Sequence, residues 1–207
     1  MDLASALTSF ATIFVVIDPV GMAPIFVAMT SDMAPAHRRA VAIRACVIAA
    51  GILMVFGLFG NALLSTLGIS LAAFRIAGGL LLFLIAVDML FEKRTERREG
   101  READADNHDP SVFPLATPLI AGPGSMAAMI LLNSGNEVTW LDRLEVQLVM
   151  LTVVGLVLIL FFLSAVIARL LGRTGILVVT RLLGMLLAAL SVQFVLNGLI
   201  DLGVLTG

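Results

Sequence analysis

An acidic residue stands next to a proline inside an otherwise apolar stretch of the chain. The stretch reads IDPVGMAPIF, and it places Asp18, Pro19, Gly21 and Pro24 within about two helical turns of one another. Proline removes a backbone hydrogen-bond donor and disfavours helix in the residue before it. We therefore expect a local break in a helix here, with a carboxylate at the break and free backbone carbonyls near Ile17.

A second stretch, ATPLIAGPGSMAAMI, carries a similar pattern of prolines and glycines. Its residues of interest are Thr117, Pro118, Gly122, Pro123, Gly124 and Ser125. We expect a half-helix to begin here, with free N–H groups near Ser125 and Met126 that suit a carboxylate. The carbonyls that end the first half-helices, near Ile17 and Ala116, suit an ammonium group or a cation. Two such breaks facing each other would hold both poles of a zwitterion.

Asp18 has two roles open to it, and they are compatible. Ionisable residues inside membrane spans are costly and usually face a cavity or a charged partner, so Asp18 is a candidate proton carrier. Alternatively, its side chain only caps the second half-helix. The second stretch has Thr117 at the corresponding position. Only the first stretch therefore offers a titratable group at its break.

Composition indicates which elements position these residues. The 207 residues are 60% hydrophobic and 14% charged, whereas soluble domains carry about 25% charged residues. The net charge of −2 says nothing about nucleic acid, but no basic stripe interleaved with aromatic residues is present, and we expect no nucleic-acid partner. Apolar runs of about 20 residues each suffice to cross a bilayer as a helix. The sequence predicts an all-α membrane protein with six spans, at 3–30, 41–60, 69–91, 112–134, 145–168 and 176–200.

The basic residues predict how these spans are oriented. One side holds ten of the basic residues in its connections, namely Arg38, Arg39, Arg44, Lys93, Arg94, Arg97, Arg98, Arg101, Arg169 and Arg173. The other side holds only Arg143. Because cytoplasmic loops are enriched in Lys and Arg, we expect the first, third and fifth connections in the cytoplasm. Both termini then face the periplasmic or outer side.

The chain reads as two halves of three spans each. Residues 1–91 form the first repeat, 92–111 a charged cytoplasmic linker, and 112–207 the second repeat, all within one membrane domain. An odd number of spans per half makes the repeat inverted. The third span of each half carries an arginine with a glycine three residues later, Arg75 with Gly78 and Arg181 with Gly184. Matched spans interrupted by Gly and Pro, here spans 1 and 4, indicate the binding site of a secondary transporter.

Other polar residues inside the spans have two interpretations each. Arg75 and Arg181 either extend to the nearer interface or pair with backbone carbonyls or Asp18 to form a gate. Asn133 either lines a pathway or forms interhelical hydrogen bonds, and the same holds for Gln193 and Asn197.

The motifs DPVGMAPIF and PLATPLIAGPGSMAAMI resemble those of the MarC family, also called UPF0056, and the resemblance runs nearly end to end. Asp18, Pro19, Gly21 and Pro24 match its first motif; the second is matched by Pro114, Pro118, Gly122, Pro123, Gly124 and Ser125. The resemblance implies a bacterial inner-membrane protein related to the lysine exporter superfamily. It also implies ion-driven transport of small neutral amino acids such as glycine and alanine.

The leading hypothesis is therefore an ion-coupled secondary transporter that holds a small zwitterionic amino acid at the broken helices. We expect no cofactor and no metal site, with H⁺ or Na⁺ as the coupling ion. A channel or a non-transporting membrane scaffold is the alternative. An intramembrane enzyme is disfavoured because His37 and His108 both lie in predicted loops and leave Ser125 without an evident histidine base. The partners expected are the amino acid and the lipid bilayer, and both a homo-oligomer and a monomer fit the sequence.

Overall fold

The computed structural model describes residues 3–30, 33–91, 109–134 and 138–205, and these residues form helices and short connections without a strand. The helices are α1 (Leu3–Ile17), α2 (Pro19–Met29), α3 (Pro35–Thr66), α4 (Leu71–Leu90), η1 (Ser111–Ile120), α6 (Pro123–Leu132), α7 (Trp140–Phe162) and α8 (Ser164–Asp201). Most of the predicted linker 92–111, with its five basic residues, lies outside the described residues.

The helices have the length and apolar composition that a bilayer requires. Five stretches pass on both counts: Ala4–Met29, Pro35–Thr66, Leu71–Leu90, Trp140–Phe162 and Thr174–Asp201. The pair Ser111–Ile120 and Pro123–Leu132 makes a sixth if it counts as one bent span. Each stretch agrees with one of the six predicted spans, apart from its ends.

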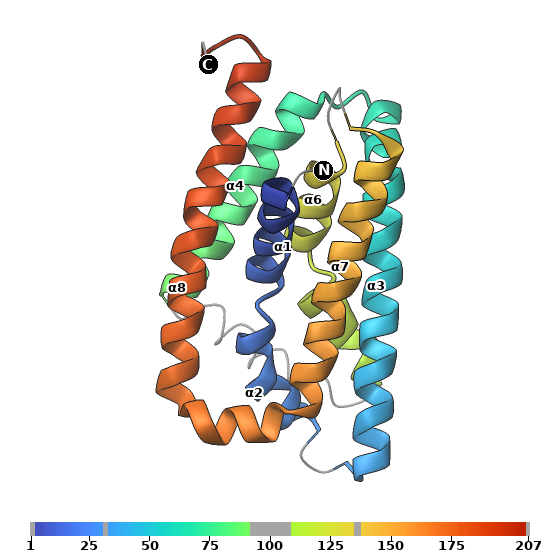
Figure 1. Ribbon diagram of the computed structural model, residues 1–207, viewed down its shortest axis with the longest axis vertical. Helices are drawn as coiled ribbons and strands as arrows, with labels where there is room; N and C mark the ends of the chain where they lie inside the picture. Colours follow the sequence, from blue (N-terminus) through green and yellow to red (C-terminus); the bar gives the residue numbers. More distant parts are fainter. Residues whose placement is uncertain (1–2, 31–32, 92–108, 135–137, 206–207) are drawn as a thin grey trace.

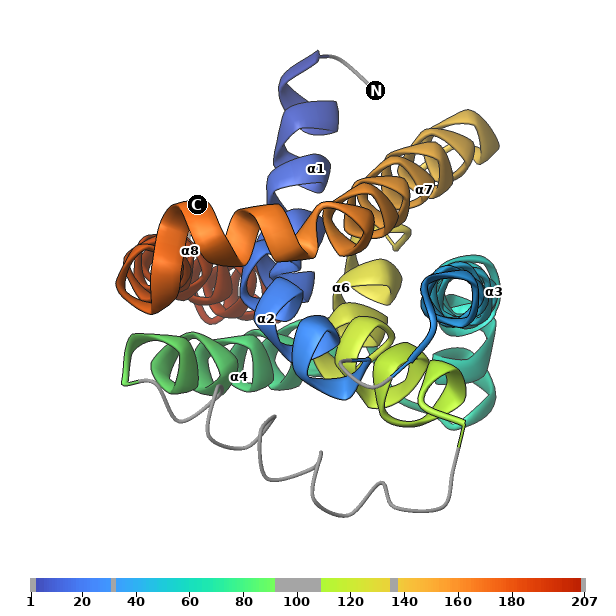
Figure 2. The same ribbon diagram turned by 90° about the horizontal axis from the view of Figure 1, so that it is seen from below.

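The bundle has two flanking pairs of helices around a centre (Figures 1 and 2). On one side α4 packs against α8, and on the other α3 packs against α7. Between these pairs, α1 and α2 pack against α7 and α8, while η1 and α6 pack against α3, and α6 also contacts α4. We call the end where α2 leads to α3 the Arg38 end, and the end where α3 leads to α4 the Arg75 end.

The path of α8 corrects one prediction. A loop was expected at 169–175, but α8 begins at Ser164 and stays helical except at Gly172, where φ is +59° and ψ is 178°. This conformation is open to glycine and strained for other residues. The first part of α8 therefore lies across the Arg38 end before the rest turns to run along the bundle (Figure 1). The apolar run SAVIARLL favours helix over loop, and Gly172 supplies the turn.

Glycines bring α4 and α8 into close contact. A Cβ atom added at Gly79 would lie 2.7 Å from the carbonyl oxygen of Ser191, and one at Gly184 would lie 3.3 Å from that of Ala86. Only glycine lets the two backbones approach this closely, as in other membrane helix pairs. Helices α4 and α8 thus pack against each other along their glycine faces.

Candidate functional site

The first interruption is at Asp18, between α1 and α2. Asp18 has φ +57° and ψ +64°, a left-handed conformation that Asp adopts more readily than most residues. Its N–H still donates to the carbonyl of Phe14 at 2.9 Å, and its carbonyl accepts from Met22 at 3.1 Å. The chain therefore continues from α1 into α2 with a one-residue distortion, and Ala4–Met29 remains long enough for a single span.

The Asp18 carboxylate folds back onto the start of α2. Its Oδ1 accepts the Gly21 N–H at 3.1 Å, and the residue is 1% exposed. A Cβ atom at Gly21 would lie 2.1 Å from Oδ2, so a side chain there would displace the carboxylate. Pro19 occupies the first helical position, where its missing N–H costs nothing. The geometry is that of a helix cap, which is one of the two roles that the sequence allows for Asp18.

The second interruption lies between η1 and α6, whose axes differ by 51°. Phe113 and Thr117 have extended dihedrals inside η1, each before a proline, as the steric effect of proline on its predecessor requires. The Ala121 N–H donates to the carbonyl of Ala116 at 2.8 Å, a bond that spans one residue more than a normal helical turn. The backbone is thus wider than an α-helix immediately before it bends.

Ser125 joins the two sides of this bend. Its hydroxyl accepts the Gly122 N–H at 2.9 Å and donates to the Ile120 carbonyl at 2.7 Å, and its side chain is buried. A Cβ atom at Gly122 would lie 2.4 Å from the carbonyl oxygen of Pro118, so this position requires glycine. Ser125 and Gly122 therefore both stabilise the bend. In the sequence, a serine directly after Gly-Pro-Gly inside an apolar run indicates this position.

The two interruptions meet in the centre of the bundle, because α1 packs against α6. A Cβ atom at Gly124 would lie 2.4 Å from Ile85 of α4 and 3.4 Å from Val16, two residues before Asp18. The first turn of α6 thus lies beside the end of α1. Thr117 and Pro118 are half-buried, whereas Pro123 is exposed.

The structure places Arg75 away from the interruptions. Arg75 pairs with Asp201 at the end of α8 and donates to the carbonyl of Ser134 at 3.3 Å. It therefore ties α4 to the ends of α8 and α6 at the Arg75 end. Arg181 lies on α8 with an exposed side chain.

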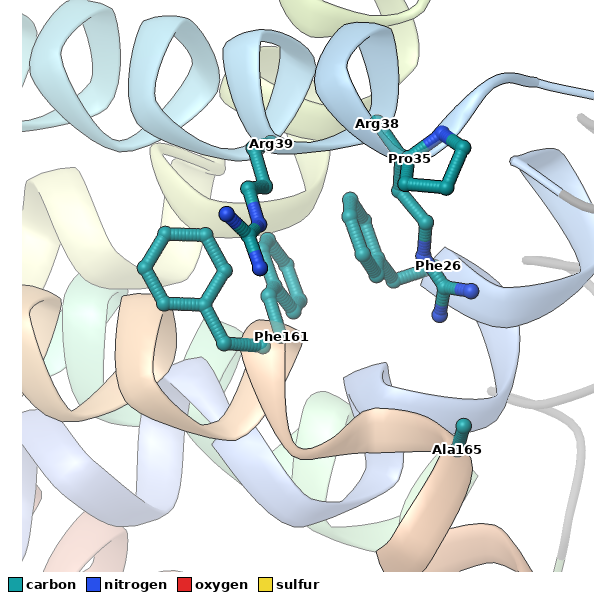
Figure 3. Close-up of a pocket in the computed structure, with 7 residues that line it drawn as sticks. Phe26, Pro35, Arg38, Arg39, Phe161 and Ala165 are labelled. Carbon is teal, nitrogen blue, oxygen red and sulfur yellow. The ribbon is translucent and has the colours of Figure 1, made fainter.

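A cavity at the Arg38 end was not predicted from the sequence. It has a volume of about 350 Å³ and is lined by Phe26, Pro35, Arg38, Arg39, Phe161, Phe162 and Ala165 (Figure 3). Phe26 stacks on Phe161 with ring centroids 4.3 Å apart, and the Arg38 guanidinium lies 5.2 Å from the Phe26 centroid. Arg38 also donates to the Ser164 hydroxyl at 2.8 Å. In the sequence, only the adjacent residues Arg38 and Arg39 mark this region, and they indicate the orientation of the spans rather than a cavity.

In the part of the chain that the structure describes, no three His, Cys, Asp or Glu side chains gather as a metal site would require. The polar side chains at the interruptions are the Asp18 carboxylate and the hydroxyls of Thr117 and Ser125, beside the N–H groups at the start of α6. These groups can donate hydrogen bonds or accept them.

Comparison with known proteins identifies the family. The model of the MarC family of integral membrane proteins matches residues 3–202. The chain belongs to the MarC family. It is an integral multi-pass membrane protein, and the motifs around Asp18 and Ser125 lie inside the matched region.

Relatives of the chain occur in archaea and bacteria. It is 39% identical to a UPF0056 membrane protein of Archaeoglobus fulgidus, and the aligned region covers 97% of each chain. It is 35% identical to the UPF0056 membrane protein MJ1677 of Methanocaldococcus jannaschii, over 96% of this chain and 98% of the relative. The UPF0056 membrane protein YvbG of Bacillus subtilis is 33% identical over 92% of each chain. No solved structure matches the chain.

Proposed function

We propose that this MarC family protein is a secondary transporter that moves small neutral amino acids, such as glycine and alanine, across the bacterial inner membrane. The observation that carries the proposal is the meeting of the two interruptions in the centre of the bundle, where the start of α6 lies beside the end of α1. A proton or sodium gradient drives the transport. In this proposal the protein shares its transport chemistry with the lysine exporter superfamily and catalyses no reaction.

The substrate is held by its two charged groups. The carboxylate binds at the N-terminus of α6, where the Gly124 and Ser125 N–H groups belong to the first helical turn and precede the intrahelical bonds. The ammonium group binds near the Ile17 carbonyl and the Asp18 carboxylate. The Asp18 carboxylate already accepts the Gly21 N–H, and its negative charge complements an ammonium group. Thr117, Pro118 and Pro123 shape the same region.

Two features support a small substrate and the absence of catalysis. Ile85 and Val16 lie directly against Gly124, so the space around the start of α6 is limited. The Ser125 hydroxyl is engaged with the Ile120 carbonyl and the Gly122 N–H, whereas a serine nucleophile requires a neighbouring general base.

The contacts between the halves support an inverted repeat. The first interrupted segment packs against α7 and α8, and the second packs against α3 and α4. Each interrupted segment therefore contacts the two long helices of the other half. This is the pattern expected if a two-fold pseudo-symmetry relates the halves. We propose that movement between these halves alternately opens the two ends.

We assign the two gates to contacts at opposite ends of the bundle. The stack of Phe26 on Phe161, braced by Arg38, closes the Arg38 end. The pair between Arg75 and Asp201 closes the Arg75 end. Arg181 is the proposed counterpart of Arg75 in the second half.

The test is uptake of labelled glycine and alanine into proteoliposomes under an imposed proton or sodium gradient. We expect saturable, gradient-driven uptake with a preference for one stereoisomer of alanine. Flux that does not saturate would indicate a channel instead. No uptake across a panel of amino acids, by protein shown to be inserted and folded, would refute the substrate assignment and favour a scaffold. Light scattering on the same preparation would distinguish a homo-oligomer from a monomer.

The orientation is tested separately. In a Cys46→Ala background, Val204→Cys and His37→Cys place single thiols at exposed positions of opposite ends. We expect a membrane-impermeant maleimide added to intact spheroplasts to label the first and not the second. The reverse result would place the termini in the cytoplasm.

A further inference from the structure

A group of buried polar atoms near the Arg75 end lacks hydrogen-bond partners among the described residues. The atoms are Asn133 Oδ1, Ser134 Oγ, Arg143 Nε and both amide atoms of Gln147. Asn133, Ser134 and Gln147 are 2%, 4% and 6% exposed. Because buried polar groups are nearly always paired with protein, water or a ligand, these atoms mark a position that water or a polar ligand can occupy.

Two of these side chains converge on one glycine of α3. A Cβ atom at Gly57 would lie 2.3 Å from Gln147 Nε2 and 3.2 Å from Asn133 Nδ2. The Gln147 amide of α7 and the Asn133 amide, directly after α6, thus both lie against the α3 backbone at Gly57, where α3 has no side chain. Arg143 precedes Gln147 by one helical turn, so the two residues share a face of α7. We call the residues Gly57, Asn133, Ser134, Arg143 and Gln147 the polar chamber.

The kinds of atom in the polar chamber indicate the class of ligand. Gln147 Nε2 and Arg143 Nε are donors, Asn133 Oδ1 and Gln147 Oε1 are acceptors, and a serine hydroxyl is both. A bare cation would satisfy only the oxygens and would face the Arg143 guanidinium. A bare anion would satisfy only the donors. A zwitterion satisfies both sets, with its carboxylate on the donors and its ammonium group on the acceptors.

The polar chamber is separate from the interruptions. Asn133 lies eight residues after Ser125 along α6, which corresponds to about 12 Å. It is connected to the Arg75 end, because the carbonyl of Ser134 accepts a hydrogen bond from Arg75, which also pairs with Asp201. A ligand here would therefore lie between the interruptions and the Arg75 gate.

We propose that the polar chamber is a second binding station for the amino-acid zwitterion, on the Arg75 side of the central site. This inference rests on the proposed transport of amino acids. The substrate occupies this station before or after the central site, depending on the direction of transport. Gln147 is its main determinant, since both the nitrogen and the oxygen of its amide lack a hydrogen-bond partner among the described residues.

The test compares two variants with matched controls. Gln147→Leu removes the unpaired amide, and Gln193→Leu makes the same change at an exposed position of α8. Gly57→Ala adds a methyl group that would lie 2.3 Å from Gln147 Nε2 and so displaces that amide, whereas Gly51→Ala adds one on the same helix with no atom within 4 Å. The measurements are equilibrium binding of labelled glycine to the purified protein, the KM of uptake, and the thermal unfolding midpoint as a check on folding.

We expect wild-type protein to bind two glycines per chain at saturation. Gln147→Leu and Gly57→Ala should each lose one of them and raise KM at least tenfold, while both controls match the wild type. Acetate and methylamine, which carry one charge each, should not displace glycine from this station.

Three results would overturn the inference. If folded Gln147→Leu and Gly57→Ala both keep the wild-type stoichiometry and KM, the second station is refuted and the transporter stands. If acetate or methylamine displaces labelled glycine from the station as effectively as unlabelled glycine does, the zwitterion assignment is refuted. If the wild type neither binds nor transports any amino acid, both this inference and the proposed function fall.

Discussion

Substitutions of Asp18 can separate its role as a helix cap from a role in transport. Loss of an N-cap costs about 1 kcal/mol, and a residue without a polar side chain in the left-handed region costs about 1 kcal/mol more. Because Asp18 caps Gly21 from φ +57°, we expect Asp18→Ala to lower stability by about 2 kcal/mol. For a chain of this size that corresponds to a fall of about 4–8 °C in the unfolding midpoint.

Two further substitutions sharpen this prediction. Asn tolerates the left-handed region, and its side-chain oxygen can still accept the Gly21 N–H, so Asp18→Asn should keep the wild-type midpoint. Glycine relieves the backbone strain and loses only a few tenths of a kcal/mol as a cap, so Asp18→Gly should also stay close to wild type. Thermal unfolding of the purified protein in one detergent, followed by circular dichroism, measures all three.

The results lead to distinct conclusions. An Asp18→Ala midpoint equal to that of the wild type would refute the capping argument, as would an Asp18→Gly loss as large as that of Ala. Uptake by the stable Asp18→Asn variant then tests the carboxylate itself. If gradient-driven uptake is lost, the charge of Asp18 takes part in coupling or binding. If uptake is unchanged, Asp18 acts only as a cap.

Three other predictions concern the second interruption and the residues before it. Ser125→Ala removes the bonds to the backbone on both sides of the bend, and we expect a stability loss of about 1–3 kcal/mol by denaturant titration; no loss would show that the bend holds without the hydroxyl. Gly124→Ala forces a methyl group to within 2.4 Å of a side-chain carbon of α4, so its unfolding midpoint should fall by several degrees while Gly155→Ala, with no atom within 4 Å, keeps the wild-type value. Hydrogen bonds from the Ser111 hydroxyl and N–H lower the pKa of Asp109, so its stabilising contribution is present above the pKa of the unfolded chain and is lost as the pH falls through the folded value. The stability difference between wild type and Asp109→Asn should then be constant above about pH 5 and shrink below about pH 4, and a difference that grows on acidification would contradict the sign.

Local sequence was enough to predict the membrane spans. An apolar run of about 20 residues has few options other than a membrane helix. The proline after Thr117 favours an extended conformation in the residue before it, which is the conformation found. The proline after Asp18 disfavours the right-handed helical region for that residue, but its left-handed conformation is one that Asp tolerates and that proline does not itself require. The predicted loop at 169–175 was wrong. Local sequence does not show where the chain turns, and the turn is made by the single residue Gly172 inside α8.

The contacts between distant residues depended on the tertiary structure. Arg75 and Asp201 are 126 positions apart, as are Arg38 and Ser164. Gly57 meets Gln147 only because α3 packs against α7. Every apolar helix in a membrane offers several faces of similar hydrophobicity, so its sequence predicts that it spans but not which face meets which neighbour. That choice is made by close packing at glycines and by the pairing of buried polar groups, which become visible only when all the helices are in place.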